Sequence, residues 1–270
     1  MTGSMNELKS DSAAAAADAG DSLLSMHNIR VVSIILMSFV CFQCIDQFLY
    51  VVFDKILPLR ISERIVAVRS SQWRFNNIFI SFIHSCLSGV GSVLCFYWFP
   101  HMAENMFTSH NIYSICLVSF STGYFLHDFV HNTHGDSKRS AQEIMGHHVV
   151  VMACFSFSLF AQKYITYSLV SLLVEVNSIF LHSRQLMQIA NISRSSMTYR
   201  LNSLVTVGTY IFFRISTLSW LTRWIMLNKD SIPIPAFALG SSGLFIMTVI
   251  NIVLFIRLLK SDFFRKNKES

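Results

Sequence analysis

The chain has 270 residues, of which 53% are hydrophobic and 13% are charged, and its mean hydropathy is +0.49. Soluble domains have roughly a quarter of their residues charged, so this composition excludes an ordinary soluble fold and favours a single membrane domain. The net charge of +6 comes from basic residues that cluster at the ends of apolar runs, where they face lipid headgroups. Aromatic residues do not interleave with them, so no nucleic-acid partner is expected.

Apolar runs predict a series of membrane-spanning helices after a disordered amino-terminal tail. Residues 1–28 contain an alanine run among Ser, Asp and Gly, and such a segment cannot bury a core. The first predicted span, residues 31–53, has no signal-peptide n-region before it and is expected to be retained. Further spans are predicted at residues 76–98, 112–130, 146–160, 164–181, 203–224 and 236–258.

The fourth predicted span is short, and only a few residues separate it from the fifth. These segments form either two spans or one span with a re-entrant piece, so the fold class is an all-α polytopic membrane protein of six or seven transmembrane helices. We expect a disordered tail at 1–28, a transmembrane domain at 29–262 and a short basic cytosolic tail at 263–270. With seven spans the basic loops all fall on one side, which places the amino terminus outside and the carboxyl terminus in the cytosol.

Ionisable residues within the predicted spans are the candidate functional residues, because each costs several kcal/mol in a bilayer. His127, Asp128 and His131 stand at the end of the third span, and the spacing of four puts both histidines on one helix face. His147 and His148 begin the fourth span. Adjacent helical side chains point about 100° apart, so only one of this pair is expected to face a given cavity.

A third group lies in the fifth span, where Glu175 and Asn177 are followed by His182 near the cytosolic end. His84 is a further intramembrane histidine, which either lines the same chamber or makes a structural hydrogen bond. Arg214 is a buried cation that either neutralises Glu175 or holds the phosphate of a lipid or coenzyme. The glycines of the Gly-x-Gly at residues 89–91 predict close helix packing.

The three clusters lie at or near the cytosolic ends of their spans, so packed helices predict a polar chamber open to the inner leaflet. Histidine suits such a chamber because it takes and gives a proton near neutral pH. In acyl transfer it accepts a proton from an attacking hydroxyl or amine, or acts as the nucleophile, while a carboxylate fixes its tautomer.

Metal chemistry is the alternative for these histidines. His127, His131, His134, His147 and His148 superficially resemble the histidine boxes of membrane desaturases and hydroxylases, and neutral imidazoles bind iron or zinc. Those enzymes need several boxes, and the required second box, H-x-x-H-H, is missing here. No metal is therefore expected.

Several segments resemble the TLC domain in order and spacing over roughly residues 30–265. They are WRFNN at 73–77, SFIHS at 81–85, GYFLHD at 123–128, the histidine pair at 147–148, LVEVNSIFL at 173–181 and RLLKSDF at 257–263. The chain looks most like the calfacilitin-like branch of that family. The resemblance implies a TLC-type helical barrel. Ceramide synthases of the family use paired histidines in acyl transfer from acyl-CoA, and His147 and His148 match that pair.

The calfacilitin-like branch is associated with the phospholipid composition of the plasma membrane. It limits long-chain polyunsaturated acyl chains in phosphatidylethanolamine and so affects membrane fluidity. Glu175 matches the acidic position of this branch, whereas ceramide synthases carry an aspartate-rich motif that this sequence lacks, which argues against ceramide synthesis. His131 stands where relatives often have an acidic residue.

The residues and the resemblance together predict a protein that sets phospholipid acyl composition. The expected chemistry is transfer of an acyl group from acyl-CoA, as co-substrate, to a lysophospholipid. The predicted catalytic residues are His147, His148, Asp128, His127 and Glu175, and the predicted substrate-binding residues are Arg214, His84, Asn177 and His182. The rival interpretation is a non-catalytic regulator that binds phospholipids or partner proteins in the same chamber. The expected location is the plasma membrane, with the endoplasmic reticulum membrane as the alternative.

Overall fold

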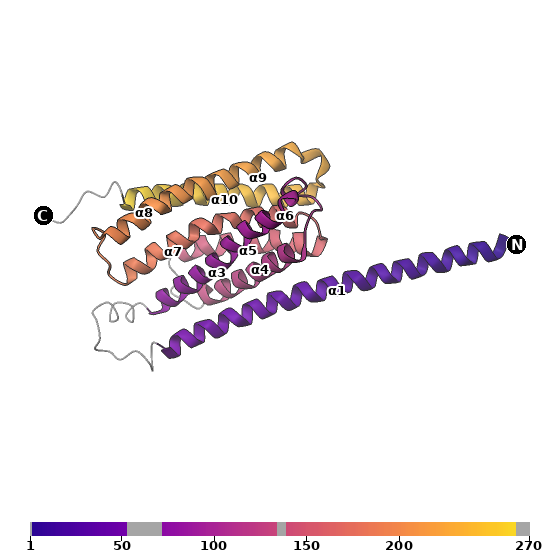
Figure 1. Ribbon diagram of the computed structural model, residues 1–270, viewed down its shortest axis with the longest axis horizontal. Helices are drawn as coiled ribbons and strands as arrows, with labels where there is room; N and C mark the ends of the chain where they lie inside the picture. Colours follow the sequence, from indigo (N-terminus) through magenta and orange to yellow (C-terminus); the bar gives the residue numbers. More distant parts are fainter. Residues whose placement is uncertain (1, 53–71, 134–138, 263–270) are drawn as a thin grey trace.

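The computed structural model of the chain describes residues 2–52, 72–133 and 139–262, and all regular structure in these ranges is helical (Figure 1). The first helices are α1 (Thr2–Val51), α3 (Gln72–Trp98), α4 (Ile112–Thr133) and α5 (Arg139–Ala161). Next comes a rod made of α6 (Ile165–Ser171), the single turn Leu172–Val174 and α7 (Glu175–Ile189). A second rod joins α8 (Met197–Thr209), a π-helical turn (Tyr210–Ile215) and α9 (Ser216–Leu227), and α10 (Ile234–Asp262) completes the bundle. Short 3₁₀ turns, Pro100–Ala103 and Lys229–Ser231, lie in two of the connections.

Several of these helices, or rods of joined helices, have the length and apolarity of membrane spans. In the described ranges, five segments are long and apolar enough to cross a bilayer: Gly20–Val51, Gln72–Trp98, Ile165–Ile189, Met197–Leu227 and Ile234–Asp262. Met145–Ala161 is a shorter apolar helix, and α4 lies between α1 and α5. Large apolar side chains such as Phe212 and Phe245, each 70% exposed, face outward as a lipid-facing surface requires. The predicted all-α, multi-pass membrane fold is confirmed.

The fourth and fifth predicted spans are two helices joined by a tight turn, and the choice between two spans and one span with a re-entrant piece stays a prediction. The turn between α5 and α6 contains Gln162 and Tyr164, both with positive φ, of 52° and 64°. The backbone N–H of Lys163 donates to the carbonyl of Ser158 at 3.2 Å and closes the end of α5. Across the hairpin, the hydroxyls of Ser158 and Ser168 lie 2.9 Å apart. The chain therefore reverses direction here within a few residues.

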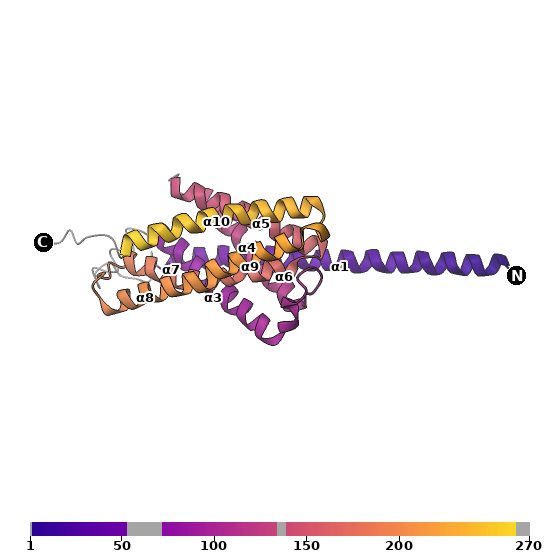
Figure 2. The ribbon, with the colours of Figure 1, turned by 90° about the horizontal axis from the view of Figure 1, so that it is seen from above.

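Helix α1 runs along the edge of the bundle and begins well before the predicted first span. Its amino-terminal part projects beyond the other helices (Figures 1 and 2). Contact with the bundle is present at His27, whose Nε2 lies 3.0 Å from the carbonyl of Leu159, and at the fully buried Val31. The helix thus includes residues of the segment 1–28 for which disorder is expected. The disordered tail stays a prediction, and the basic tail at 263–270 lies outside the described residues.

Two glycines allow helices to approach at backbone distance. A Cβ added at Gly89 of α3 would lie 2.8 Å from the backbone nitrogen of Val176 in α7. A Cβ at Gly123 of α4 would lie 2.4 Å from the carbonyl oxygen of Ile35 in α1. Beside Gly123, the hydroxyl of Ser38 donates to the carbonyl of Phe120 at 2.7 Å. The close packing predicted at Gly89 is confirmed, and a second, unpredicted close contact joins α1 to α4.

A buried ionic network ties α7, α8 and α10 together at one end of the bundle. Arg184 of α7 donates from Nε to Oδ2 of Asp262 at 2.7 Å and from Nη2 to the hydroxyl of Ser261 at 2.9 Å. Ser203 of α8 donates to the same Asp262 oxygen at 2.9 Å. Each charge is therefore paired and hydrogen-bonded, as ions removed from water require.

Replacing Gly123 with alanine is expected to lower the free energy of unfolding by about 1–3 kcal/mol, because the new methyl group overpacks the α1–α4 contact. The measurement is the melting temperature of the purified full chain in detergent, followed by tryptophan fluorescence. The matched control is Gly208→Ala in α8, where an added Cβ meets nothing within 4 Å. The control should melt at the wild-type temperature or slightly above it, because alanine is the better helix former. Equal melting of Gly123→Ala and wild type would contradict the α1–α4 packing.

Candidate functional site

A cavity of about 640 Å³ lies inside the bundle, within the size range of small-molecule sites. Its lining comes from α3, α4, α5, the α6–α7 rod, the π turn with α9, and α10. None of the described residues that line it belongs to α1, which packs on the outside against α4. The barrel wall therefore begins at α3, and α1 is an outer helix.

The cavity is long, and its histidines and charged residues lie away from one end. Along α10 the lining runs from Ala236 to Arg257, which is about 30 Å at 1.5 Å per residue. At the end near the α5–α6 turn the lining is largely aromatic and aliphatic, with Tyr164, Leu221 and Trp224. Asp128, His147, His148 and His182 lie toward the opposite end, Glu175 and Arg214 lie near the middle of their rods, and the polar groups near the α5–α6 turn are mainly hydroxyls such as those of Ser158 and Ser168. The expected polar chamber is thus a slender, mainly apolar cavity with one polar half, because long apolar helices supply most of its wall; its opening toward the inner leaflet stays a prediction.

An ordered chain of polar contacts crosses the polar half. Nδ1 of His148 in α5 lies 2.9 Å from Oδ2 of Asp128 in α4. Asn132, one turn further along α4, donates to the same carboxylate oxygen at 2.9 Å and to the carbonyl of Asp128 at 2.7 Å. Asn77 of α3 donates to Oδ1 of Asn132 at 3.2 Å. If Nδ1 of His148 carries the proton that faces this carboxylate, Nε2 is the nitrogen that takes a proton.

His147 and Glu175 face the same cavity. The rings of His147 and His148 lie 5.0 Å apart, and both residues line the cavity. The expectation that only one of them would do so is wrong, because the cavity extends around α5 by more than the 100° between adjacent side chains. Nδ1 of His147 has no hydrogen-bond partner among the described residues. Oε2 of Glu175 accepts a hydrogen bond from Ser85 of α3 at 2.7 Å.

Arg214 brings a positive charge to the cavity from the π-helical turn between α8 and α9. Its Nη1 donates to Oδ1 of Asn251 in α10 at 2.7 Å, and Nη2 donates to Ser178 in α7 at 2.8 Å. Its guanidinium lies 5.3 Å from the ring centre of Tyr210. In the described ranges these two hydrogen-bond partners are uncharged, Nε of Arg214 has no partner, and no ion pair joins Arg214 to Glu175. A π turn inside an α-helix is often found at a functional site.

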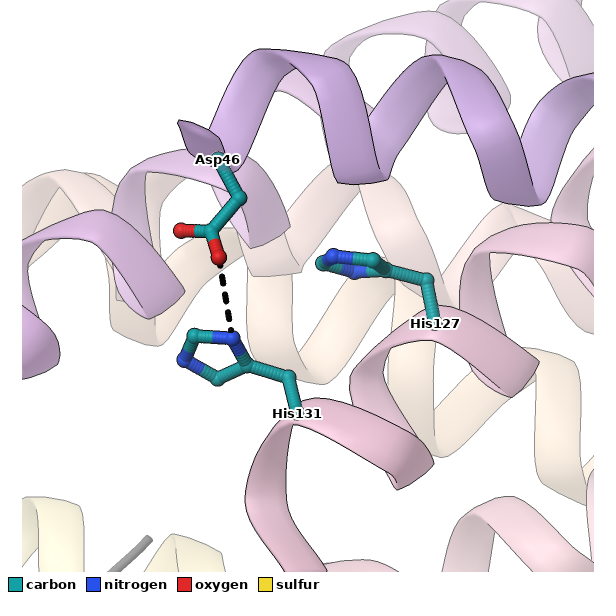
Figure 3. Close-up of side chains that lie close together, drawn as sticks. All are labelled: Asp46, His127 and His131. Atoms are coloured by element: carbon teal, nitrogen blue, oxygen red, sulfur yellow. Dashed lines mark ion pairs between the residues drawn. The ribbon is translucent and has the colours of Figure 1, made fainter. Parts of the chain in front are cut away.

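Four further predicted site residues lie in different places. His182 lines the cavity, with Nδ1 3.4 Å from Oε1 of Gln185. His84 is fully buried behind the cavity wall, stacked on Tyr124 with 3.8 Å between ring centres. Asn177 joins helices instead, since its Nδ2 donates to the carbonyl of Thr206 at 2.8 Å. His127 lies at the α1–α4 interface, close to His131 (Figure 3). The structure thus gathers six of the nine predicted residues around the cavity, leaving out His84, Asn177 and His127.

The neutral polar residues that orient the charged ones were not predicted from the sequence. They are Asn77, Ser85, Asn132, Ser178 and Asn251. Each of these is polar and lies in or beside an apolar run, which is a weak signal because serine and asparagine also pack between membrane helices without other function. The spacing of four between Asp128 and Asn132 was the clearest signal, since it places both on one helix face.

Comparisons with known proteins point to one family. The TLC domain model matches residues 74–260. The chain is 47% identical to the TLC domain-containing protein 2 of Danio rerio over 201 residues, which are 74% of this chain and 81% of that protein. It is 34% identical to the human TLC domain-containing protein 1 over 207 residues, 77% of this chain and 82% of that protein. It is also 33% identical to the TLC domain-containing protein 2 of Mus musculus, covering 71% of this chain and 61% of that protein.

Filling the cavity from α10 should displace whatever apolar molecule occupies it. Met247 lines the cavity, whereas Phe245 on the same helix is 70% exposed on the outer face. We predict that Met247→Trp, measured by native mass spectrometry of protein purified in mild detergent, carries at most about half the co-purified lipid of wild type. The control Phe245→Trp should carry the wild-type amount, because its ring points away from the cavity. Equal lipid on both variants would contradict a lipid-filled cavity.

Proposed function

This chain belongs to the TLC domain family, and from that premise we propose that it sets the acyl composition of membrane phospholipids by acyl transfer from acyl-CoA to a lysophospholipid. The single observation that carries the proposal is the placement of the His148–Asp128 pair in the wall of a long, mainly apolar cavity. An acyl chain fits the apolar half, and the polar half receives the reacting groups.

The proposed step is general base catalysis by His148. Asp128 accepts from Nδ1–H, so Nε2 takes the proton from the hydroxyl of the lysophospholipid as that oxygen attacks the thioester carbonyl. A carbon–oxygen bond forms, the carbon–sulfur bond breaks, and the proton passes from His148 to the departing coenzyme A thiolate. His147 lines the cavity beside His148. Its Nδ1, which has no partner among the described residues, is a second ring nitrogen that can face the reacting carbonyl.

The remaining charged residues suit substrate positioning. The guanidinium of Arg214 donates hydrogen bonds to the uncharged side chains of Ser178 and Asn251, and no described carboxylate forms an ion pair with it. Such a group binds the phosphate of a lysophospholipid or of the coenzyme. Glu175 accepts a hydrogen bond from Ser85 and lines the same cavity as a neighbouring acceptor for an amine or hydroxyl headgroup.

The proposed consequence lies in membrane fluidity. Transfer selective for shorter or more saturated acyl groups limits long-chain polyunsaturated chains in phosphatidylethanolamine. We place the protein in the plasma membrane, with the endoplasmic reticulum membrane as the alternative, and surface biotinylation of intact cells distinguishes the two.

A non-catalytic regulator that binds phospholipid or a partner protein is the second candidate, and one observation favours it. The same contacts that orient the polar residues also join helices: His148–Asp128 links α5 to α4, and Arg214 links the π turn to α7 and α10. In this view the polar half is a set of structural hydrogen bonds, and lipid in the cavity only stabilises the fold.

The test replaces the proposed base while keeping its shape. His148→Gln retains a donor toward Asp128 but has no titratable nitrogen, so we expect formation of labelled phosphatidylethanolamine from acyl-CoA and its lyso form to fall by at least about 100-fold in the purified protein. In cells that lack the protein, wild type should restore phosphatidylethanolamine acyl composition, and His148→Gln and His147→Ala/His148→Ala should not.

The matched control is His101→Gln, an exposed histidine in the connection after α3, which should behave as wild type in both assays. All variants are compared at equal membrane expression and with wild-type melting temperature. Full rescue by His148→Gln, with no acyltransferase activity in the wild-type protein, would refute acyl transfer and favour the regulator.

A further inference from the structure

A second cluster of ionisable side chains lies outside the cavity, between α1 and α4. It consists of Asp46 from α1 and His127 and His131 from α4 (Figure 3). None of the three lines the cavity. Asp46 is separated by about eighty positions from the histidines, so only the packing of α1 on α4 brings it to them.

The three side chains converge on a common point. Each offers one ligand atom, and these atoms all lie within 4.8 Å of one another. Nδ1 of His131 is 3.3 Å from Oδ2 of Asp46, and the two imidazole rings are 5.8 Å apart. Two ligands of a tetrahedral zinc ion lie roughly 3.3 Å apart, because each bond is about 2.0–2.1 Å long. The Asp46–His131 distance therefore suits an ion, and a ligand nitrogen of His127, within 4.8 Å of the other two ligand atoms, would have to move closer to bind it.

Several buried polar atoms of this cluster have no hydrogen-bond partner among the described residues. Asp46 is 3% exposed and His127 is 2% exposed. In the described ranges, Oδ1 of Asp46, both ring nitrogens of His127 and Nε2 of His131 have no hydrogen-bond partner. Asp46 and His131 pair with each other, and the ring of Trp73 stacks on the imidazole of His131 with 5.3 Å between ring centres. This pairing accounts for the burial of Asp46 and His131, but it gives the ring nitrogens of His127 no partner. Polar atoms buried without partners are costly and point to an absent ligand.

We propose that Asp46, His127 and His131 bind one divalent transition-metal ion of the zinc class. Two imidazoles and one carboxylate suit zinc, iron, cobalt or nickel, and they leave at least one position for water. The ion compensates the buried carboxylate and gives each histidine a nitrogen–metal bond. The sequence predicted no metal because its histidines do not form the boxes of membrane desaturases, and Asp46 lies far from them along the chain.

The proposed ion fastens α1 to the barrel. Its ligands come from both helices, and it lies in the same interface as the close contact at Gly123. The role is structural, so the inference stands apart from acyl transfer, and either proposal can fail without the other.

Cobalt(II) is the probe for the experiment, because its visible absorption reports tetrahedral coordination and zinc displaces it. The full chain, purified without a histidine tag in lipid nanodiscs and stripped with a chelator, should bind about one cobalt ion per chain with a visible band that zinc removes. Asp46→Asn and His131→Asn should weaken this binding by at least about tenfold. The exposed His101→Asn should leave it unchanged.

His131→Cys keeps a ligand and distinguishes coordination from a merely structural role. Its thiolate should add a sulfur-to-cobalt charge-transfer band in the near ultraviolet. Wild type holds six free cysteines, none of them in the proposed site, and should lack this band. Wild type that binds no more cobalt or zinc than the Asp46→Asn/His131→Asn double variant would overturn the proposal. A His131→Cys protein that binds cobalt without the new band would overturn it as well.

Discussion

Every polar side chain in this bundle has to find its partner inside the protein, because the hydrocarbon core of a bilayer offers none. Arg184 and Asp262 meet this demand fully, with added hydrogen bonds from Ser203 and to Ser261. Asp128 meets it through His148 and Asn132. Among the described residues, Nε of Arg214 and the ring nitrogens of His127 and His84 do not meet it.

The same constraint explains why the cavity and the α1–α4 interface are separate. A helix in a bundle presents successive side chains about 100° apart, so His127 and Asp128 point to different sides of α4. Asp128 faces α5 and the cavity, whereas His127 faces α1 and Asp46. The family model begins at residue 74, after α1, and the barrel wall also begins with α3. The outer helix is an addition to the barrel, held by close packing at Gly123 and by the proposed metal ion.

Sequence reasoning predicted the spans because apolar length is a local property of the chain. It also predicted that His147, His148, Asp128, Glu175 and Arg214 would share a site, because ionisable residues in spans gather in the bundle interior. It failed where the answer depends on helix rotation. His84 and Asn177 lie in the right helices but point into the packing between helices, and no hydropathy pattern distinguishes those directions. Asp46 was missed because its partners lie about eighty positions further along the chain.

Helix α4 connects the two sites, and this connection has a physical consequence. The carboxylate of Asp128 orients His148 only if α4 keeps its rotation about its own axis, since a turn of α4 moves Asp128 away from α5. On the side of α1 that rotation is fixed by the contact of Gly123 with Ile35, by the hydrogen bond of Ser38 to Phe120, and by Asp46 against His131. A metal ion shared by Asp46, His127 and His131 would hold α4 in the same rotation more firmly than the single ion pair does. The outer helix contributes no lining residue among those described, and it reaches the cavity only through its packing against the helix that carries the carboxylate.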